Sequence, residues 1–363
     1  MRITQTLILL SLLACVGFGQ GDTYVISQQG FLSLFPLYQS WQVAGGIKFS
    51  ETSGGLMLYT PLSREASVTL RGAGGSSNGD IAKLGGVGDA QIMFNYHAER
   101  ANLIFSLGIN LPSGKKKLTQ EEFETSGILS AAIFHMQVPN FGMGFNVEPG
   151  VIWAIPVNDD VVVGIGATYR YKGKFQPLEE FGDYDPGDEI LVTGGADIRL
   201  AEGTTMSADI VFTTYGRDKL DGAAVFTPGN KIAVNMQFRK QFHRSDLSLY
   251  GRYRSKGKSE FDIGGVLVPE DEKTDPDQVE VSGTYNMRLN DQVSLAILSE
   301  MRFHKETPAP FTGITLIGVG VAPTLKVSDN ISVPARFKYL TGKTKDDKTL
   351  TGFEAGLGLR IDF

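Results

Sequence analysis

The chain has 363 residues, of which 20% are charged and 44 are glycine, and its formal net charge is -6. A negative chain with no basic stretch argues against a nucleic-acid partner. Its mean hydropathy of -0.06 is too polar for a bundle of membrane helices, and no internal run approaches the roughly 18 apolar residues that a spanning helix needs.

The amino terminus is organised like an export signal. Arg2 precedes an apolar run from Leu7 to Val16, and two small residues, Gly17 and Gly19, follow before Gln20. This order predicts a cleaved secretory signal peptide over residues 1–19. An alternative interpretation takes residues 12–15, LLAC, as a lipobox with a lipidated Cys15. Because Cys15 is the only cysteine, the folded protein has no disulfide in either case.

Residues 20–40 show no clean period, and we predict a periplasmic lead-in or a short plug there. From Trp41 to Phe363 the chain alternates between long segments of period two, which predict β-strands, and polar connections. We predict about sixteen strands. Their ranges are 41–49, 54–62, 67–74, 90–97, 102–112, 146–157, 161–173, 190–201, 204–216, 230–242, 247–257, 278–289, 292–304, 314–327, 330–342 and 351–363. Counts of fourteen or eighteen stay open, because residues 128–138 are either an extra strand or a helix within a loop.

The predicted connections alternate between short and long. The short ones are rich in Asn, Asp, Gly and Ser, as tight turns require; examples are residues 158–160, 202–203 and 290–291. The long ones include residues 75–89, 113–145, 174–189 and 258–277. Short turns on one rim and long loops on the other are typical of an outer-membrane β-barrel.

The last strand has the form of a strand that closes such a barrel. In residues 351–363, TGFEAGLGLRIDF, one face carries Phe353, Leu357 and Phe363 and the other carries Glu354 and Arg360. We expect this strand, which ends on the aromatic Phe363, to be recognised by the barrel-assembly machinery.

Side chains of a strand point alternately to its two faces. The ionisable residues of the predicted strands lie almost wholly on one of these alternating sets of positions (one parity), and the other set is apolar. The basic ones are Lys48, Arg71, Arg170, Lys172, Arg199, Arg239, Arg252, Arg254, Arg288, Arg302, Lys326, Arg336, Lys338 and Arg360; the acidic ones are Glu148, Asp197, Asp209, Glu280, Glu300, Glu354 and Asp362. Because lipid is the simplest partner for so much apolar strand surface, the charged parity is predicted to face the lumen.

The predicted lumen holds more basic than acidic residues. One interpretation pairs these charges in ladders that stabilise the wall and transport nothing. The other makes the lumen a pore with a mild preference for anions. In it, five residues form a basic wall opposite a sector lined by glycines such as Gly318 and Gly320. These five are Arg239, Arg252, Arg254, Arg288 and Arg302.

Two prolines flank the predicted turn at residues 328–329. Pro323 and Pro334 should lie side by side on adjacent strands, and neither has an N–H to donate to the ladder. They mark either a frayed strand end or a lateral opening through which an apolar solute leaves into the bilayer.

We expect no enzymatic activity, cofactor or metal. The four histidines, His97, His135, His243 and His304, lack metal-ligand spacing and are expected to be solvated, and no nucleophile–histidine constellation is present.

Two stretches resemble known families. Residues 86–97, GVGDAQIMFNYH, followed by residues 102–114, NLIFSLGINLPSG, resemble outer-membrane proteins linked to phenol-degradation meta-pathways. In that family a Gly-x-Gly-Asp strand start precedes a strand ending in Pro-Thr-Gly, where this chain has Pro112-Ser113-Gly114. More weakly, the hairpin of residues 145–171 is similar to one in the long-chain fatty acid transporters, although residues 20–40 lack the Asn-Pro-Ala motifs of their hatch. The resemblance implies passage of hydrophobic small molecules.

The sequence therefore predicts an all-β, antiparallel transmembrane β-barrel over residues 41–363, located in the cell outer membrane after export. The expected function is a passive transporter or pore for small solutes, apolar ones included. The expected partners are outer-membrane lipid, lipopolysaccharide and the solute. The alternative is a structural or adhesive barrel whose lumen is closed by its own paired charges and by the loop of residues 113–145.

Overall fold

The computed structural model describes residues 29–43, 46–115, 117–138, 142–179 and 182–363. The predicted signal peptide, residues 1–19, and Cys15 lie outside the described residues. Among those described, no helix has the length and apolarity needed to cross a bilayer.

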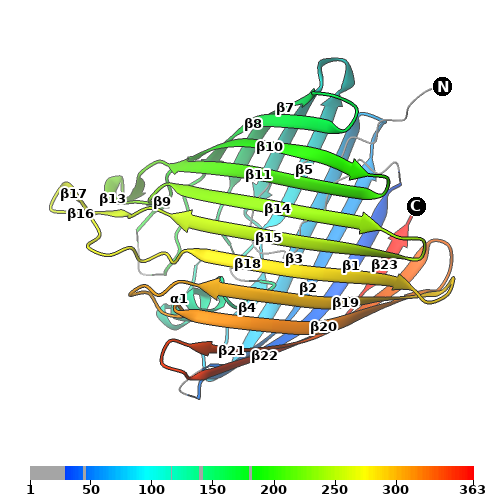
Figure 1. Ribbon diagram of the computed structural model, residues 1–363. Helices are drawn as coiled ribbons and strands as arrows, with labels where there is room; N and C mark the ends of the chain where they lie inside the picture. The colour runs from blue at the N-terminus through cyan, green and yellow to red at the C-terminus, as the bar shows by residue number, and fades with distance from the viewer. Residues whose placement is uncertain (1–28, 44–45, 116, 139–141, 180–181) are drawn as a thin grey trace.

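The protein is a closed antiparallel β-barrel of sixteen strands, as predicted (Figure 1). The ring closes where β1 (Phe31–Gln42) pairs with β22 (Thr349–Leu357) and β23 (Leu359–Asp362), which are two parts of one strand interrupted at Gly358. The other barrel strands are β2 (Lys48–Pro61), β3 (Ala66–Gly79), β5 (Ala90–Ala98), β6 (Leu103–Leu111), β7 (Asn146–Pro156), β8 (Val161–Lys172), β10 (Glu189–Ala201), β11 (Thr204–Tyr215), β14 (Lys231–Gln241), β15 (Ser245–Lys256), β18 (Gln278–Arg288), β19 (Val293–His304), β20 (Ile314–Lys326) and β21 (Ile331–Thr344).

The two rims differ as the sequence predicted. The short-turn rim carries the tight connections, one of which contains the 3-10 helix η1 (Glu99–Ala101). The first and last barrel strands both have their free ends at this rim. There Gly30 and Phe363 exchange two backbone hydrogen bonds of 3.0 and 2.9 Å. The long-loop rim carries β4 (Gly85–Val87), which adds to β3, and α1 (Gln120–Leu129). It also carries a five-stranded sheet in the order β17 (Val266–Pro269), β16 (Glu260–Ile263), β13 (Ala223–Thr227), β12 (Asp218–Leu220) and β9 (Tyr184–Asp185).

Side chains alternate between an apolar outer face and a charged inner face. On β8, Ile165, Tyr169 and Tyr171 are exposed on the outside, whereas Arg170 and Lys172 make ion pairs on the inside. Of the residues predicted to face inward, Lys48 is an exception: it directly precedes Phe49, whose buried side chain faces the interior.

The barrel begins earlier than predicted. Residues 31–40, expected to be a lead-in or plug, form most of β1, and residues 43–47 connect β1 to β2, so the predicted strand 41–49 is wrong. The period is hidden because Phe35 and Leu37 are apolar on the inner face as well. There they cover Gly356 and Gly358 of the closing strand. Residues 20–28 lie outside the described part of the chain.

Candidate functional site

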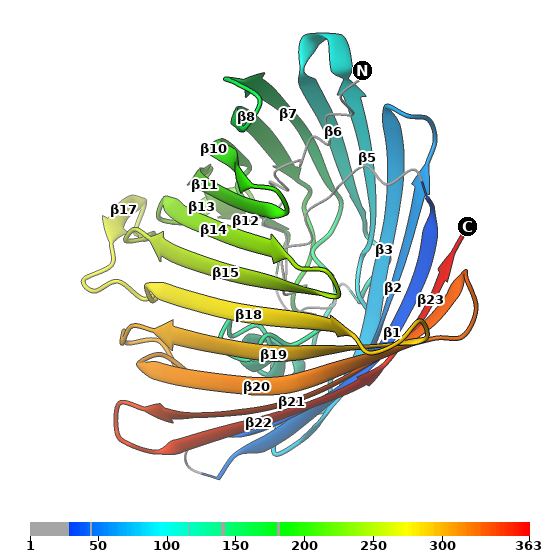
Figure 2. The same cartoon turned by 45° about the vertical axis from the view of Figure 1, so that its right-hand side comes forward.

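The connection between β6 and β7, residues 112–145, is here named the inward loop. Its described residues 117–138 turn into the barrel (Figure 2). Its helix α1 starts with a capping box, in which Thr119 and Glu122 each bond the other's backbone N–H through their side chains. The chain then continues through residues 130–138 without regular structure. Residues 128–138 are therefore not an extra strand, and only Ile128 and Leu129 belong to the helix.

Phe134 anchors the inward loop to the wall. Its fully buried ring lies 5.2 Å from that of Trp41 and 5.1 Å from those of Phe49 and Phe311, between centroids. Further buried side chains of the loop and the wall join this core: Val43, Leu84, Leu118, Leu129, Ile133, Met136, Val138, Ile314, Leu316, Leu340 and Leu350. Since each large apolar side chain contributes about 1.5–3 kcal/mol on burial, the loop is held in the lumen as firmly as an element of a globular core.

Polar side chains of β1 and β2 bind the backbone of the inward loop. Gln39 donates from Nε2 to the carbonyl of His135 (3.1 Å) and accepts from the N–H of Gln137 at Oε1 (2.9 Å). Glu51 accepts from the N–H of Val138 (3.1 Å). Gln39 and Glu51 are both 0% exposed. They supply partners for loop backbone groups that have left water.

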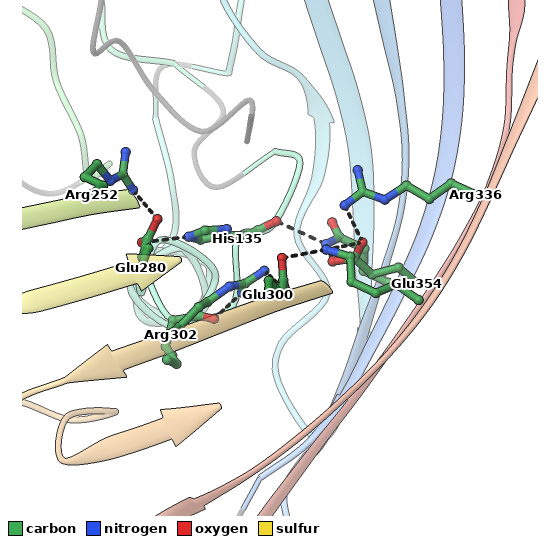
Figure 3. Close-up of polar contacts among 10 residues, drawn as sticks. His135, Arg252, Glu280, Glu300, Arg302, Arg336 and Glu354 are labelled. Carbon is green, nitrogen blue, oxygen red and sulfur yellow. Dashed lines mark hydrogen bonds and ion pairs between the residues drawn. The ribbon is translucent and has the colours of Figure 1, made fainter. Parts of the chain in front are cut away.

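Strands β18 and β19 hold the same segment from the other side (Figure 3). Arg302 donates from Nη1 to the carbonyl of Ile133 (2.5 Å), and Nε2 of His135 lies 3.1 Å from Oε1 of Glu280. The second oxygen of Glu280 accepts from Arg252 (2.8 Å). Residues 133–138 are thus bound at both ends to an arc of the wall that runs from β18 through β22 to β2.

The ion pairs continue along this arc from Glu300 to Glu354. Nζ of Lys338 lies 3.0 Å from Glu300 and 3.2 Å from Glu354, and Arg336 lies 3.2 Å from Glu354. Glu300 and Lys338 belong to β19 and β21, which are separated by β20. Gly318 of β20 leaves the room, because a Cβ there would lie 2.8 Å from Cγ of Glu300. The predicted glycine sector therefore partly serves to let ion pairs cross a strand.

The opposite arc, on β7, β8 and β10, carries a separate charged ladder. Arg170 lies between Glu148 and Glu189, with its Nε 2.9 Å from the first carboxylate and its Nη1 2.5 Å from the second. Lys172 approaches Glu189 to 2.6 Å. The prediction of paired ladders therefore describes both arcs.

A cavity of about 160 Å³ separates this ladder from the inward loop. On the wall it is lined by charged and amide side chains of β3 to β10, including Gln91 and Asn146 beside the ladder, and by the apolar residues Ile92, Met93 and Ile109. On the loop side it is lined by Gln137, Val138 and Met143. The loop therefore packs against one arc of the lumen, and this cavity lies between the loop and the other arc.

The structure does not bring the five predicted basic residues together. Arg252 and Arg302 are engaged by carboxylates, and Arg254 donates to the side chain of Gln278, all in the half of the lumen near the long-loop rim. Arg239 and Arg288 lie near the ends of β14 and β18 at the short-turn rim. Neither of these two guanidinium groups has an ion-pair or hydrogen-bond partner within the described residues.

Pro323 and Pro334 lie on neighbouring strands where the ladder is interrupted. Strands β20 and β21 pair as far as Val321 and Phe337 and resume at Thr324 and Pro334. A similar interruption separates β1 from the closing strand around Gly358. Phe35 covers this second interruption from the lumen: a Cβ on Gly358 would meet its ring at 2.7 Å and Pro334 at 3.0 Å.

Three of the four histidines are less solvated than predicted. His97 and His304 are buried, and His135 belongs to the network around Glu280. His243 is exposed, as predicted. Within the part of the chain that the structure describes, no group of three or more His, Cys, Asp or Glu is arranged to hold a metal ion.

The apolar part of the inner wall was not predicted from the sequence. Its signal is visible in residues 314–321, ITLIGVGV, where both parities are apolar: Ile317 and Val319 point outward, and Ile314 and Leu316 point into the core. A barrel strand that is apolar on both faces must be covered from inside as well as by lipid.

Comparison with solved structures agrees with this architecture. CdiB from Acinetobacter baumannii superposes with a TM-score of 0.54 at 8% identity over 90% of this chain, which spans only 60% of the CdiB chain. The outer membrane channel DcaP of A. baumannii gives a TM-score of 0.46 at 11% identity, covering 92% of this chain and 96% of its own. An anion-selective porin from Comamonas acidovorans gives 0.43 at 11% identity, covering 92% and 98%.

These similarities concern the fold alone. No protein-family model and no curated protein matches the chain, so the resemblance to the phenol-degradation family is not confirmed. The geometry shows a closed antiparallel sixteen-stranded β-barrel with a loop folded into its lumen, and the superposition on CdiB agrees with the barrel fold.

Proposed function

We propose that the protein is an outer-membrane channel through which small solutes pass passively, along the arc of the lumen that the inward loop leaves uncovered. The observation that carries this proposal is the cavity between the loop and the ladder of β7, β8 and β10, which is lined by charged and amide side chains together with apolar ones. The charged and amide groups suit the passage of hydrated solutes.

A mild preference for anions is part of the proposal. The charges near the long-loop rim are largely engaged in pairs, whereas Arg239 and Arg288 present guanidinium groups at the short-turn mouth. Unpaired charge of one sign at a pore mouth concentrates the opposite ion. The preference is therefore assigned to these two residues and not to a continuous basic wall.

Planar bilayers test the proposal. The purified barrel, with its folding checked by the different migration of heated and unheated samples on a detergent gel, is expected to produce stepwise currents. The reversal potential in a KCl gradient should show chloride to be more permeable than potassium. A correctly folded barrel that gives no steps would favour the rival, a structural or adhesive barrel whose lumen is closed by the inward loop and by paired charges. Steps with potassium more permeable would remove the anion preference and leave the pore.

Lateral release of an apolar solute is a second proposal, favoured by the interrupted ladder between β20 and β21. In this interpretation, Pro323 and Pro334 keep the two strands from pairing fully. Replacing both prolines with valine should restore the ladder and slow the uptake of apolar solutes into cells. Unchanged uptake with normal assembly would remove the lateral route.

A further inference from the structure

Both ends of the inward loop meet at one carboxylate. Asp89, in the residue pair that joins β4 to β5, accepts a hydrogen bond at Oδ1 from the N–H of Gly114 (2.9 Å) and one at Oδ2 from the N–H of Met143 (2.7 Å). Gly114 belongs to the first residues of the loop and Met143 to the last. A single side chain thus ties the outgoing limb of the loop to its returning limb.

Further contacts hold the two limbs of the loop together beside Asp89. Asn110 donates from Nδ2 to Oδ2 of Asp89 (2.9 Å) and to the carbonyl of Gly144 (2.7 Å). The two limbs are in direct contact, because a Cβ on Gly142 would lie only 2.6 Å from the carbonyl oxygen of Lys115. We name this set of contacts the neck of the inward loop.

The neck also joins two sequence motifs. Gly86-Val87-Gly88-Asp89 precedes β5, and Pro112-Ser113-Gly114 follows β6. Ser113 donates from its Oγ to the carbonyl of Gly88 (3.4 Å) and accepts from the N–H of Ala90 (2.9 Å), and Asp89 accepts from the N–H of Gly114, so each motif binds the other through a side chain. These residues give both motifs one physical role at the place where the loop enters the barrel.

We propose that Asp89 is a positioning residue that closes the neck of the inward loop and thereby sets the width of the open arc. A carboxylate has two oxygens and can accept all three N–H groups at once. Hydrogen bonds to a charged acceptor are also stronger than those to a neutral one. Asparagine at this position has one acceptor oxygen, so at least one limb of the loop loses its bond.

The first measurement reports the position of the loop without requiring transport. Thr125 on α1 is 2% exposed and bonds the carbonyl of Ala82, so a Thr125→Cys reporter should react slowly with a water-soluble maleimide. Adding Asp89→Ala or Asp89→Asn should raise the labelling rate at least several-fold. Asp80→Asn is the matched control, because Asp80 accepts from the N–H of Lys48 at the same rim and has no such bond to the described residues of the inward loop.

The second measurement is conductance, and this arm rests on the proposed pore function. Asp89→Asn should give noisier and larger steps than the parent, whereas Asp80→Asn should not. Oxidation of a Gly114→Cys, Met143→Cys pair added to Asp89→Asn should restore both the parental currents and the slow labelling of Thr125→Cys. The two limbs approach closely here, because a Cβ on Gly142, next to Met143, would lie 3.3 Å from the carbonyl carbon of Gly114, and a disulfide requires such proximity.

The outcomes separate the two proposals. Labelling and currents that are unchanged in correctly assembled Asp89→Asn overturn the role of Asp89, as does a cross-link that forms and restores neither. If the parent protein makes no channels, the pore proposal fails while the labelling rates still decide the role of Asp89. If Asp89→Ala does not assemble, Asp89→Asn is used in its place.

Discussion

The two arcs of the inner wall use the same residue types for different ends. On the arc from β18 to β2, Arg302 and Lys338 are almost fully buried and hold either the inward loop or buried glutamates. On the arc from β7 to β10, Arg170 and Lys172 pair with glutamates but line the cavity. An inward-facing charged side chain therefore stabilises the structure where the inward loop covers it, and lines the cavity where the loop does not.

The largest effect, on conductance, is expected from removing the inward loop. Replacing residues 117–140 with a short glycine–serine linker should increase single-channel conductance several-fold, because the loop occupies the lumen over the β18 to β2 arc. Shortening the connection of residues 257–277 is the matched control, since its strands β16 and β17 project beyond the rim in Figure 1. Equal conductance of the loop-deleted and parent barrels would mean that the loop does not limit the pore.

The next largest effect, on stability, is expected from removing the buried ring of Phe134. Phe134→Ala is expected to lower the free energy of unfolding by about 3–5 kcal/mol, as for other buried phenylalanines, measured by urea titration in lipid vesicles. Phe123→Ala on α1 of the same loop is the control, because Phe123 is 44% exposed. A similar loss for both variants would contradict the buried anchor.

Replacing one lysine on each arc should affect stability and conductance to different degrees. Lys338→Met leaves Glu300 and Glu354 with one fewer buried partner and should destabilise the barrel by about 3–5 kcal/mol, with little change in single-channel conductance. Lys172→Met should destabilise less, because Glu189 keeps Arg170, but it should change the conductance, because Lys172 lines the cavity. The comparison of arcs is wrong if both variants change stability and conductance alike.

The smallest effect is expected at the mouth. Arg239→Gln combined with Arg288→Gln should move the reversal potential in a KCl gradient toward zero anion preference without changing stability, because neither guanidinium is paired within the described chain. Lys240→Gln is the control, since Lys240 has the outward parity and lies 5.3 Å from the ring of Phe242. A shift of equal size in the control would point to general surface charge.

Much of the barrel could be predicted because its rule is local. On β8 and β18, every second side chain meets either lipid or the lumen, and neighbours in sequence reveal the pattern. The rule failed on β1, where Phe35 and Leu37 are covered from within, and on residues 128–138, whose surroundings come from strands elsewhere in the chain. Asp89 and Pro112-Ser113-Gly114 were noticed as motifs, but their contact was not predicted.

Period two along the chain determined the all-β class, the sixteen strands and the difference between the rims, because solvent on one face and lipid on the other act on each strand separately. Only the tertiary structure decided which inward charges are buried, where the loop lies and which arc stays open. Arg302 shows why: its partner, the carbonyl of Ile133, is 169 residues away. No local pattern specifies a hydrogen bond between two groups that only closure of the barrel brings together.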